Sequence, residues 1–238
     1  MRRMNPIAVF YHYRLSGGRP AISEPHASRI FAAQMEALGV SGLAEAASKV
    51  MAMAASVPDT MAAAPFLPAK TMSIVLGDAA TELPTLCHLQ VFAQNNPDWY
   101  IFYHHIKCAT RSDNLCRVWR ECMTRRLVLG WRHCVALLDS GCDSVGCHWL
   151  TPEQYPALVQ SPFWGGNFWW AKASFIDTLP KLSLEGDRYL AEKWIGTGIR
   201  RPQIFDLHPA WPSMECAKQW PSTFSTTFPG VPRQRLSY

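Results

Sequence analysis

Runs of β-favouring residues alternate with helical patterns along the chain, and this alternation constrains its fold more than any other feature. Residues 7–13 and 99–105 are β-branched and aromatic, which is typical of buried strands. Between them, apolar residues recur at helical spacing over residues 27–39, and again from Pro84 to a stop before Pro97. Strands that alternate with helices of this length predict an α/β fold, with a mixed, mostly parallel sheet flanked by helices.

The second half of the chain continues the pattern. Residues 73–76 predict a short strand, and either Asp113 or Asn114 can cap a helix, which a second helix follows from Trp131. A further strand is expected around residues 144–149.

Length and composition set the expected domain organisation. The chain has 238 residues, of which 48% are hydrophobic and 17% charged, and this is enough for a sizeable core. We expect a single domain over residues 1–208. Residues 209–238 are rich in proline and are expected to pack on that domain as a tail.

Charge and hydropathy argue against several other classes. The formal charge of +5 comes without a long run of one sign, so we expect no nucleic-acid partner. The most apolar window, residues 50–68, is interrupted by prolines and an aspartate, so we expect no membrane span. The N-terminus lacks the apolar segment and cleavage site of a signal peptide, which predicts a cytoplasmic protein.

The eight cysteines contain no C-x-x-C pair, so reduced, buried thiols are the expected state rather than a metal cluster. The closest group is Cys142, Cys147 and His148, and its spacing is poor for zinc.

Sheets of the predicted kind bind ligands at the carboxyl ends of their strands. None of these ends carries a P-loop or a G-x-G-x-x-G, which argues against a kinase-type or dinucleotide site. Tyr11, His105 and Lys107 fall at such ends and are candidates for binding a phosphorylated ligand. Lys107 can neutralise a diphosphate, and strand alternation predicts that His105 projects to the same side. The alternative is an ordinary solvated strand end.

Several short clusters in the chain form a recognisable signature. They read Gly-Asn-Phe-Trp-Trp-Ala at residues 166–171, Leu-Pro at 179–180 and Arg-Tyr-x-Ala-Glu-x-Trp-Ile at 188–195. Further clusters are Tyr-x-His-x-Lys at residues 103–107, Trp-Arg-x-x-Met at 119–123 and Asp-Ser-Val-Gly at 143–146. Over residues 82–194 the sequence therefore resembles a family of GT-A-type glycosyltransferase-like proteins.

The resemblance implies a single GT-A-like domain that transfers a sugar from a nucleotide-diphosphate sugar, such as a UDP-sugar, to an unknown saccharide or protein acceptor. The chain departs from the family pattern at Cys108, where a glycine is usual, and at residues 163–165, which read Phe-Trp-Gly instead of His-Phe-Ser. It also lacks a D-x-D pair after strand 99–105, where such enzymes hold Mn²⁺ or Mg²⁺. The alternative is a non-catalytic or regulatory module that binds a sugar nucleotide or a protein.

The resemblance also implies roles for single residues. Glu192 is the preferred catalytic base, and the alternative is a surface pair with Arg188 four positions earlier. Arg188 is expected to help to bind the donor. Asn167 is expected to hydrogen-bond sugar hydroxyls at the catalytic centre.

Aromatic and metal-binding roles complete the expected site. Trp164, Trp169 and Trp170 are expected to offer ring faces to an acceptor sugar, with at least one of them in the core. Asp143 matches the family signature and is expected to hold a ribose or a metal ion. His208 is the second metal candidate, although a lone histidine is more often structural.

Overall fold

The computed structural model describes residues 5–15, 24–77, 81–109, 113–156, 159–185 and 188–208. The predicted tail over residues 209–238 lies outside this part of the chain. Within it, no helix has both the length and the apolar character needed to cross a bilayer.

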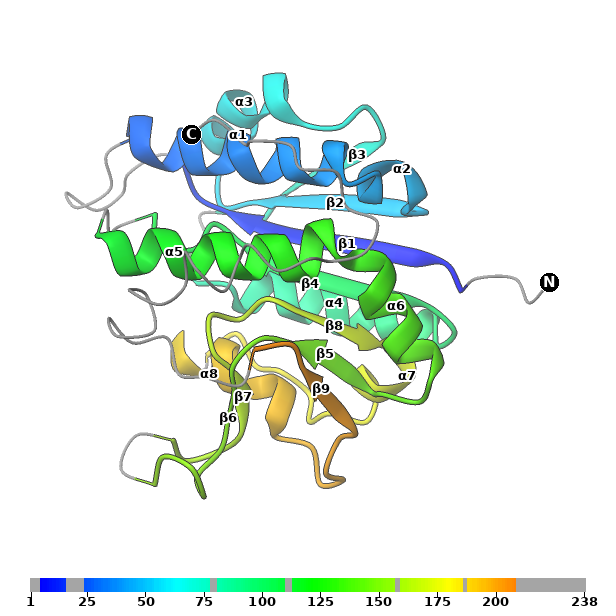
Figure 1. Ribbon diagram of the computed structural model, residues 1–238. Helices are drawn as coiled ribbons and strands as arrows, with labels where there is room; N and C mark the ends of the chain where they lie inside the picture. Colours follow the sequence, from blue (N-terminus) through cyan, green and yellow to red (C-terminus); the bar gives the residue numbers. More distant parts are fainter. Residues whose placement is uncertain are drawn as a thin grey trace.

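A seven-stranded mixed sheet forms the centre of the molecule (Figure 1). Its strand order is β3-β2-β1-β4-β8-β5-β9. Strands β3, β2, β1 and β4 are parallel, β8 is antiparallel to both neighbours, and β5 pairs in parallel with β9. The predicted α/β class with a mostly parallel mixed sheet is therefore confirmed. The strands are β1 (Ile7–Tyr13), β2 (Lys49–Ala54), β3 (Thr71–Val75), β4 (Tyr100–His105), β5 (Ser144–Gly146), β8 (Trp169–Lys172) and β9 (Ile204–Asp206).

Helices cover both faces of the sheet (Figure 1). One face packs against α1, α2, α6 and the π-helical segment η2, and the other against α4, α7 and α8. The helices are α1 (Glu24–Val40), α2 (Leu43–Ala46), α3 (Val57–Ala63), α4 (Leu83–Asn95), α5 (Asn114–Met123), α6 (Trp131–Asp139), α7 (Ala173–Ile176) and α8 (Arg188–Lys193), with the short helical segments η1 (Ala64–Phe66), η2 (Thr124–Leu129) and η3 (Trp194–Gly196).

Alternation along the central strands sorts side chains between the two cores. In β1, Val9 and Tyr11 lie in the α1 layer, whereas Ala8 and Phe10 lie in the α4 layer. Successive strand residues point to opposite faces, so both faces of this buried strand are apolar. This explains why residues 7–13 read as a continuous apolar and aromatic run.

Local signals set several element ends. Of the two candidate caps, Asp113 and Asn114, the structure uses Asp113 for α5, and its carboxylate accepts a 2.9 Å hydrogen bond from the amide of Cys116. The two helices expected after this cap, α5 and α6, are joined by η2.

The strand expected over residues 144–149 is in fact two strands. It breaks after β5, where His148 adopts a left-handed backbone with φ of 63°. Strand β6 (Trp149–Leu150) then pairs with β7 (Phe163–Trp164) in a separate two-stranded sheet.

Candidate functional site

The carboxyl ends of β1 and β4 bring two histidines together above the α4 side of the sheet. His12 and His105 are partners in the register of these parallel strands. The Nδ1 atom of His12 lies 2.8 Å from the hydroxyl of Thr85, in the first turn of α4. Burial lowers the pKa of His12 to about 4, although the charge of Glu82 opposes this effect.

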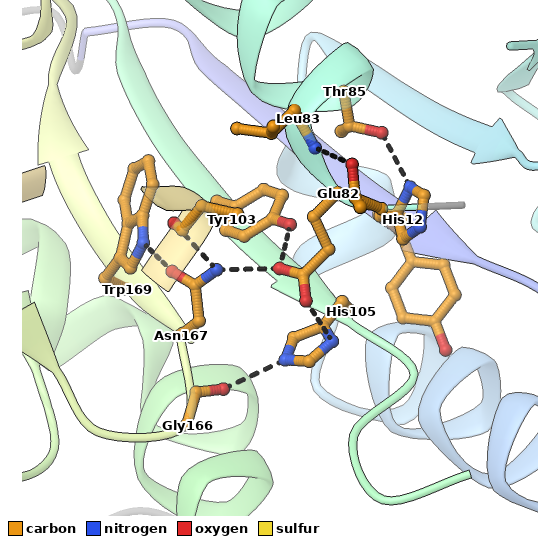
Figure 2. A network of polar contacts seen from close by, with 12 residues as sticks. His12, Glu82, Leu83, Thr85, Tyr103, His105, Gly166, Asn167 and Trp169 are labelled. Atoms are coloured by element: carbon orange, nitrogen blue, oxygen red, sulfur yellow. Dashed lines mark hydrogen bonds and ion pairs between the residues drawn. The ribbon is translucent and has the colours of Figure 1, made fainter. Parts of the chain in front are cut away.

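Glu82, the residue before α4, is the centre of a polar network (Figure 2). Its Oε1 atom lies 3.2 Å from Nδ1 of His105, and its Oε2 atom accepts a 2.7 Å hydrogen bond from the hydroxyl of Tyr103. Burial raises the pKa of this carboxyl, but His105, His12, Tyr103 and Lys107 outweigh burial and bring the pKa below its usual value. The network therefore holds an ionised carboxylate in a largely enclosed place.

Asn167 completes the network from the turn before β8. Its Nδ2 atom donates to Oε2 of Glu82 at 2.7 Å and to the carbonyl oxygen of Ala191 at 3.2 Å. Its Oδ1 atom accepts a 2.9 Å bond from the indole of Trp169. Both amide hydrogens are thus used inside the protein and the residue is 1% exposed, so Asn167 organises the site instead of offering its amide to a sugar.

The Gly-Asn pair of the signature has a conformational reason. Gly166 and Asn167 have φ of 88° and 56°, a region that glycine and asparagine tolerate best. A Cβ atom on Gly166 would also lie 2.7 Å from Sδ of Met123. The carbonyl oxygen of this glycine lies 3.0 Å from Nε2 of His105, which ties the turn to β4.

The charge of Lys107 reaches the network, and a second cation, Arg120, contacts the backbone of Lys107. The ammonium of Lys107 is 4.3 Å from the centroid of the Trp119 ring on α5, and Arg120 donates to the carbonyl oxygen of Lys107 at 3.2 Å. The indole Nε1 of Trp119 is buried and has no hydrogen-bond partner within the described part of the chain. Strand alternation ends with β4 at His105, so the His105 ring contacts Gly166 and Glu82, whereas the ammonium of Lys107 lies over Trp119.

Glu192 lies near the network on α8 and is partly exposed. Burial raises the pKa of Tyr103, and the charges of Glu82 and Glu192 raise it further. Glu192 is thus within electrostatic reach of the Tyr103 hydroxyl. The side chain of Arg188 lies outside the described residues, so its expected contacts with the donor and with Glu192 stay predictions.

The three tryptophans expected to stack on an acceptor are core residues. Trp164, Trp169 and Trp170 are all 0% exposed. Trp170 stacks on Phe102 in the α1 layer, while Trp164 and Trp169 lie in the α4 layer. No ring face is therefore available to a sugar in this conformation, and the acceptor-binding prediction is wrong for all three.

The donor-binding prediction for Tyr11 also needs correction. Its ring is 1% exposed and packs in the α1 layer, on the face of the sheet opposite to Glu82. Its hydroxyl donates to the side-chain oxygen of Gln34. Tyr11 therefore supports the core below the carboxyl edge and is not available to a ligand.

Asp143 and His208 cannot share a metal ion. Asp143 precedes β5 and bonds to Arg200 and to the amide of Gln203, both at 2.8 Å. His208 follows β9 and its carbonyl oxygen accepts from the amide of His148. Because β5 and β9 are parallel and rise about 3.3 Å per residue, these side chains lie at opposite ends of the strand pair.

A thiol and imidazole cluster lies at the carboxyl ends of β5 and β9. Cys122 hydrogen-bonds to Cys147 and His148, and the rings of His148 and His208 are 5.1 Å apart. The cluster brings together residues from α5, the turn after β5 and the segment after β9, so spacing in the sequence could not reveal it. Within the described residues, no group of three or more His, Cys, Asp or Glu side chains is arranged to hold a metal ion.

Sequence reasoning missed three residues of the network, namely Glu82, Tyr103 and His12. One signal was available for Glu82. It stands just before Leu-Pro at a predicted helix start, and a side chain at that position can face the carboxyl ends of the strands. A second was that both β-favouring runs carry a histidine near their carboxyl ends, His12 and His105, which parallel pairing brings together.

Comparisons with known proteins identify a family. The model of the family described as "Domain of unknown function (DUF8361)" matches residues 10–186. No curated protein sequence matches the chain.

Solved structures with a similar fold include 4-diphosphocytidyl-2C-methyl-D-erythritol synthase from Anaerococcus prevotii DSM 20548, at 7% identity and a TM-score of 0.46, covering 94% of this chain and 100% of that one. A second is CMP:2-keto-3-deoxy-manno-octonic acid synthetase complexed with CTP, at 11% identity and a TM-score of 0.41, covering 92% and 98%. At these values the similarities carry no argument about activity. Because the family model spans most of the sequence, the chain belongs to the DUF8361 family.

Proposed function

We propose that the chain binds a nucleoside-diphosphate sugar at the carboxyl ends of β1 and β4 and transfers the sugar to an acceptor. One observation carries the proposal. The ammonium of Lys107 lies over the ring of Trp119 at this edge of the sheet, and its positive charge reaches Glu82 in the polar network. An ammonium donates hydrogen bonds and carries positive charge, and Arg120 adds a second cation at the backbone of Lys107, so the place suits a ligand rich in acceptor oxygens and negative charge.

Glu192 is the proposed base for the acceptor proton, because it is partly exposed and lies near the enclosed network. Arg188 is proposed to contact the donor from the start of α8. Asp143 is left out of the proposed site, since it lies at the amino ends of the strands. Whether Mn²⁺ or Mg²⁺ takes part in donor binding is tested by adding each ion to the binding assay.

A thermal-shift panel of UDP-, ADP- and GDP-sugars, each with and without Mn²⁺ or Mg²⁺, tests donor binding. A ligand at about 100 times its dissociation constant stabilises by roughly 2.7 kcal/mol, which raises the melting temperature by about 5 to 10 °C for a chain of this size. Lys107→Met should weaken binding about tenfold or more, whereas Lys181→Met, at an exposed position, should not change it. No shift with any member of the panel contradicts the proposal.

A non-catalytic sugar-nucleotide module is the second candidate. It is favoured by the buried tryptophans and by the fully used amide of Asn167, which leave few side chains for an acceptor. Turnover separates the two. A base at Glu192 predicts that Glu192→Gln keeps donor affinity and loses about 10² to 10⁴ in the rate of transfer or donor hydrolysis. Donor binding without any turnover in the wild-type protein supports the binding module instead.

A further inference from the structure

The ring of His105 lies between two hydrogen-bond acceptors (Figure 2). Its Nε2 atom is 3.0 Å from the carbonyl oxygen of Gly166, and its Nδ1 atom is 3.2 Å from Oε1 of Glu82. A carbonyl oxygen has no hydrogen to donate, so Nε2 must carry one for this contact to be a hydrogen bond. The protonation of the ring then depends on whether the carboxyl group of Glu82 accepts or donates at Nδ1.

The other contacts of Glu82 favour a carboxylate. Its second oxygen accepts hydrogen bonds from both Tyr103 and Asn167. The amide of Asn167 cannot be turned around, because its oxygen is held by the indole N–H of Trp169. A carboxylate accepts both of these bonds at Oε2 and leaves Oε1 as the negative partner 3.2 Å from Nδ1 of His105, and the lowered pKa of Glu82 agrees with this state.

We propose that Glu82 and His105 form a carboxylate–imidazolium pair, in which His105 is a positioning residue that cancels the charge of Glu82 beside the phosphate-binding place. The benefit for a ligand depends on the function proposed above. A carboxylate without its imidazolium partner would repel a diphosphate and attract the ammonium of Lys107. When the pair is formed, the positive charge of Lys107 is left for the ligand.

The other histidines around the pair do not carry the positive charge that would cancel the charge of Glu82. His12 faces it from β1, and burial keeps the pKa of His12 near 4, so this ring is neutral at pH 7. His104 comes before it on β4, where burial lowers the pKa well below its usual value. Glu192 acts on the network through Tyr103 and adds negative charge. The Glu82 side chain is 17% exposed and that of His105 is 12% exposed, so the pair borders solvent.

Nitrogen NMR of histidine-labelled protein tests the protonation directly and needs no ligand. The His105 signals are assigned with a His105→Gln variant. In the wild-type protein at neutral pH both His105 nitrogens should carry a hydrogen, because each of them faces an acceptor oxygen. In Glu82→Gln one nitrogen should lose its proton at the same pH. A neutral His105 ring in the wild-type protein overturns the proposal, whatever the protein binds.

Binding of a nucleoside diphosphate, measured by calorimetry, tests the cancellation of charge. His105→Gln leaves Glu82 ionised and should weaken binding about tenfold or more. The double variant Glu82→Gln with His105→Gln should recover most of the affinity, because it removes the uncancelled charge. Near-UV circular dichroism checks that each variant is folded. A double variant that binds as weakly as His105→Gln overturns the proposal that His105 cancels the charge of Glu82. Failure of the wild-type protein to bind any nucleoside diphosphate contradicts the proposed function instead. In that case the NMR measurement alone tests whether Glu82 and His105 form an ion pair.

Discussion

The indole nitrogen of Trp169 donates a 2.9 Å hydrogen bond to the amide oxygen of Asn167, and this bond fixes the direction in which the amide points. The Nδ2 atom is thereby directed at Glu82, 2.7 Å away. Trp169 is two residues further along the chain, at the start of β8, so a tryptophan buried in the core sets the polar geometry of the site. The Asn-Phe-Trp order of the signature therefore encodes an orientation as well as an apolar core.

Replacing Asn167 with aspartate should destabilise the fold strongly. Asn167→Asp puts an oxygen where a donor contacts Glu82 and brings a second carboxylate into an enclosed place. We expect the free energy of unfolding in urea at pH 7 to fall by about 3 kcal/mol or more. The control Asn95→Asp, at an exposed position on α4, should cost less than about 1 kcal/mol. Equal losses in the two variants would show that the network adds little.

Acid should destabilise the protein partly through His12. Its pKa is about 4 in the folded protein because it is buried, against about 6.5 when unfolded. Between these pH values His12 is protonated in the unfolded chain but not in the folded protein. The free energy of unfolding therefore falls as the pH drops from 6.5 towards 4, by up to about 3 kcal/mol. Urea unfolding at several pH values should therefore show a shallower pH slope in His12→Gln.

The matched control for His12 is His88→Gln, because His88 is exposed on α4. This variant should keep the slope of the wild-type protein. A slope that is the same in all three proteins contradicts the assignment to His12.

A methyl group at Gly146 should clash with the buried ring of Trp164. An added Cβ atom would lie 2.5 Å from Cδ2 of that ring, which is enclosed on all sides. Gly146→Ala is expected to cost about 1 to 3 kcal/mol in chemical unfolding. Gly39→Ala, in a helix with nothing within 4 Å of the new atom, should instead stabilise by about 0.5 to 1 kcal/mol. If Trp164 were mobile enough to stack on a sugar, Gly146→Ala would be tolerated.

Asp143→Asn should separate stability from ligand binding. The Arg200 side chain is half exposed although Asp143 is mostly buried, so loss of their ion pair should cost about 1 kcal/mol. Nucleotide affinity should stay within about twofold of the wild-type value in this variant, with or without EDTA, because Asp143 lies at the amino ends of the strands. A loss of affinity that EDTA reproduces in the wild-type protein would return Asp143 to the site.

The sequence was most informative where a pattern is local. The apolar run of residues 7–13 and the helix start at Pro84 are decided by neighbouring residues, and both elements form where they are expected. The candidate site is different, because Glu82, His105 and Asn167 meet only when α4, β4 and the turn before β8 are assembled. A motif can name such residues, but only the tertiary fold decides whether Asn167 faces a ligand or Glu82.

The same limit explains the aromatic residues. A tryptophan is equally compatible with a sugar-binding surface and with a hydrophobic core. The sequence of a strand does not show whether helices cover one face of the sheet or both. Here helices cover both faces of β8, so Trp169 and Trp170 are both enclosed although they point in opposite directions.

The place of β8 in the sheet has a consequence for the order of folding. Strands β1 to β4 are joined by connections along the first 105 residues, but β4 obtains its other neighbour only from residues 169–172. During synthesis the edge of β4 therefore stays unpaired while more than 60 further residues are added. Closing the long loop between β4 and β8 costs a moderate amount of entropy. Until it closes, the unpaired edge can form hydrogen bonds with a strand of another chain. Substitutions that weaken β8 should thus reduce the yield of folded protein more than its final stability.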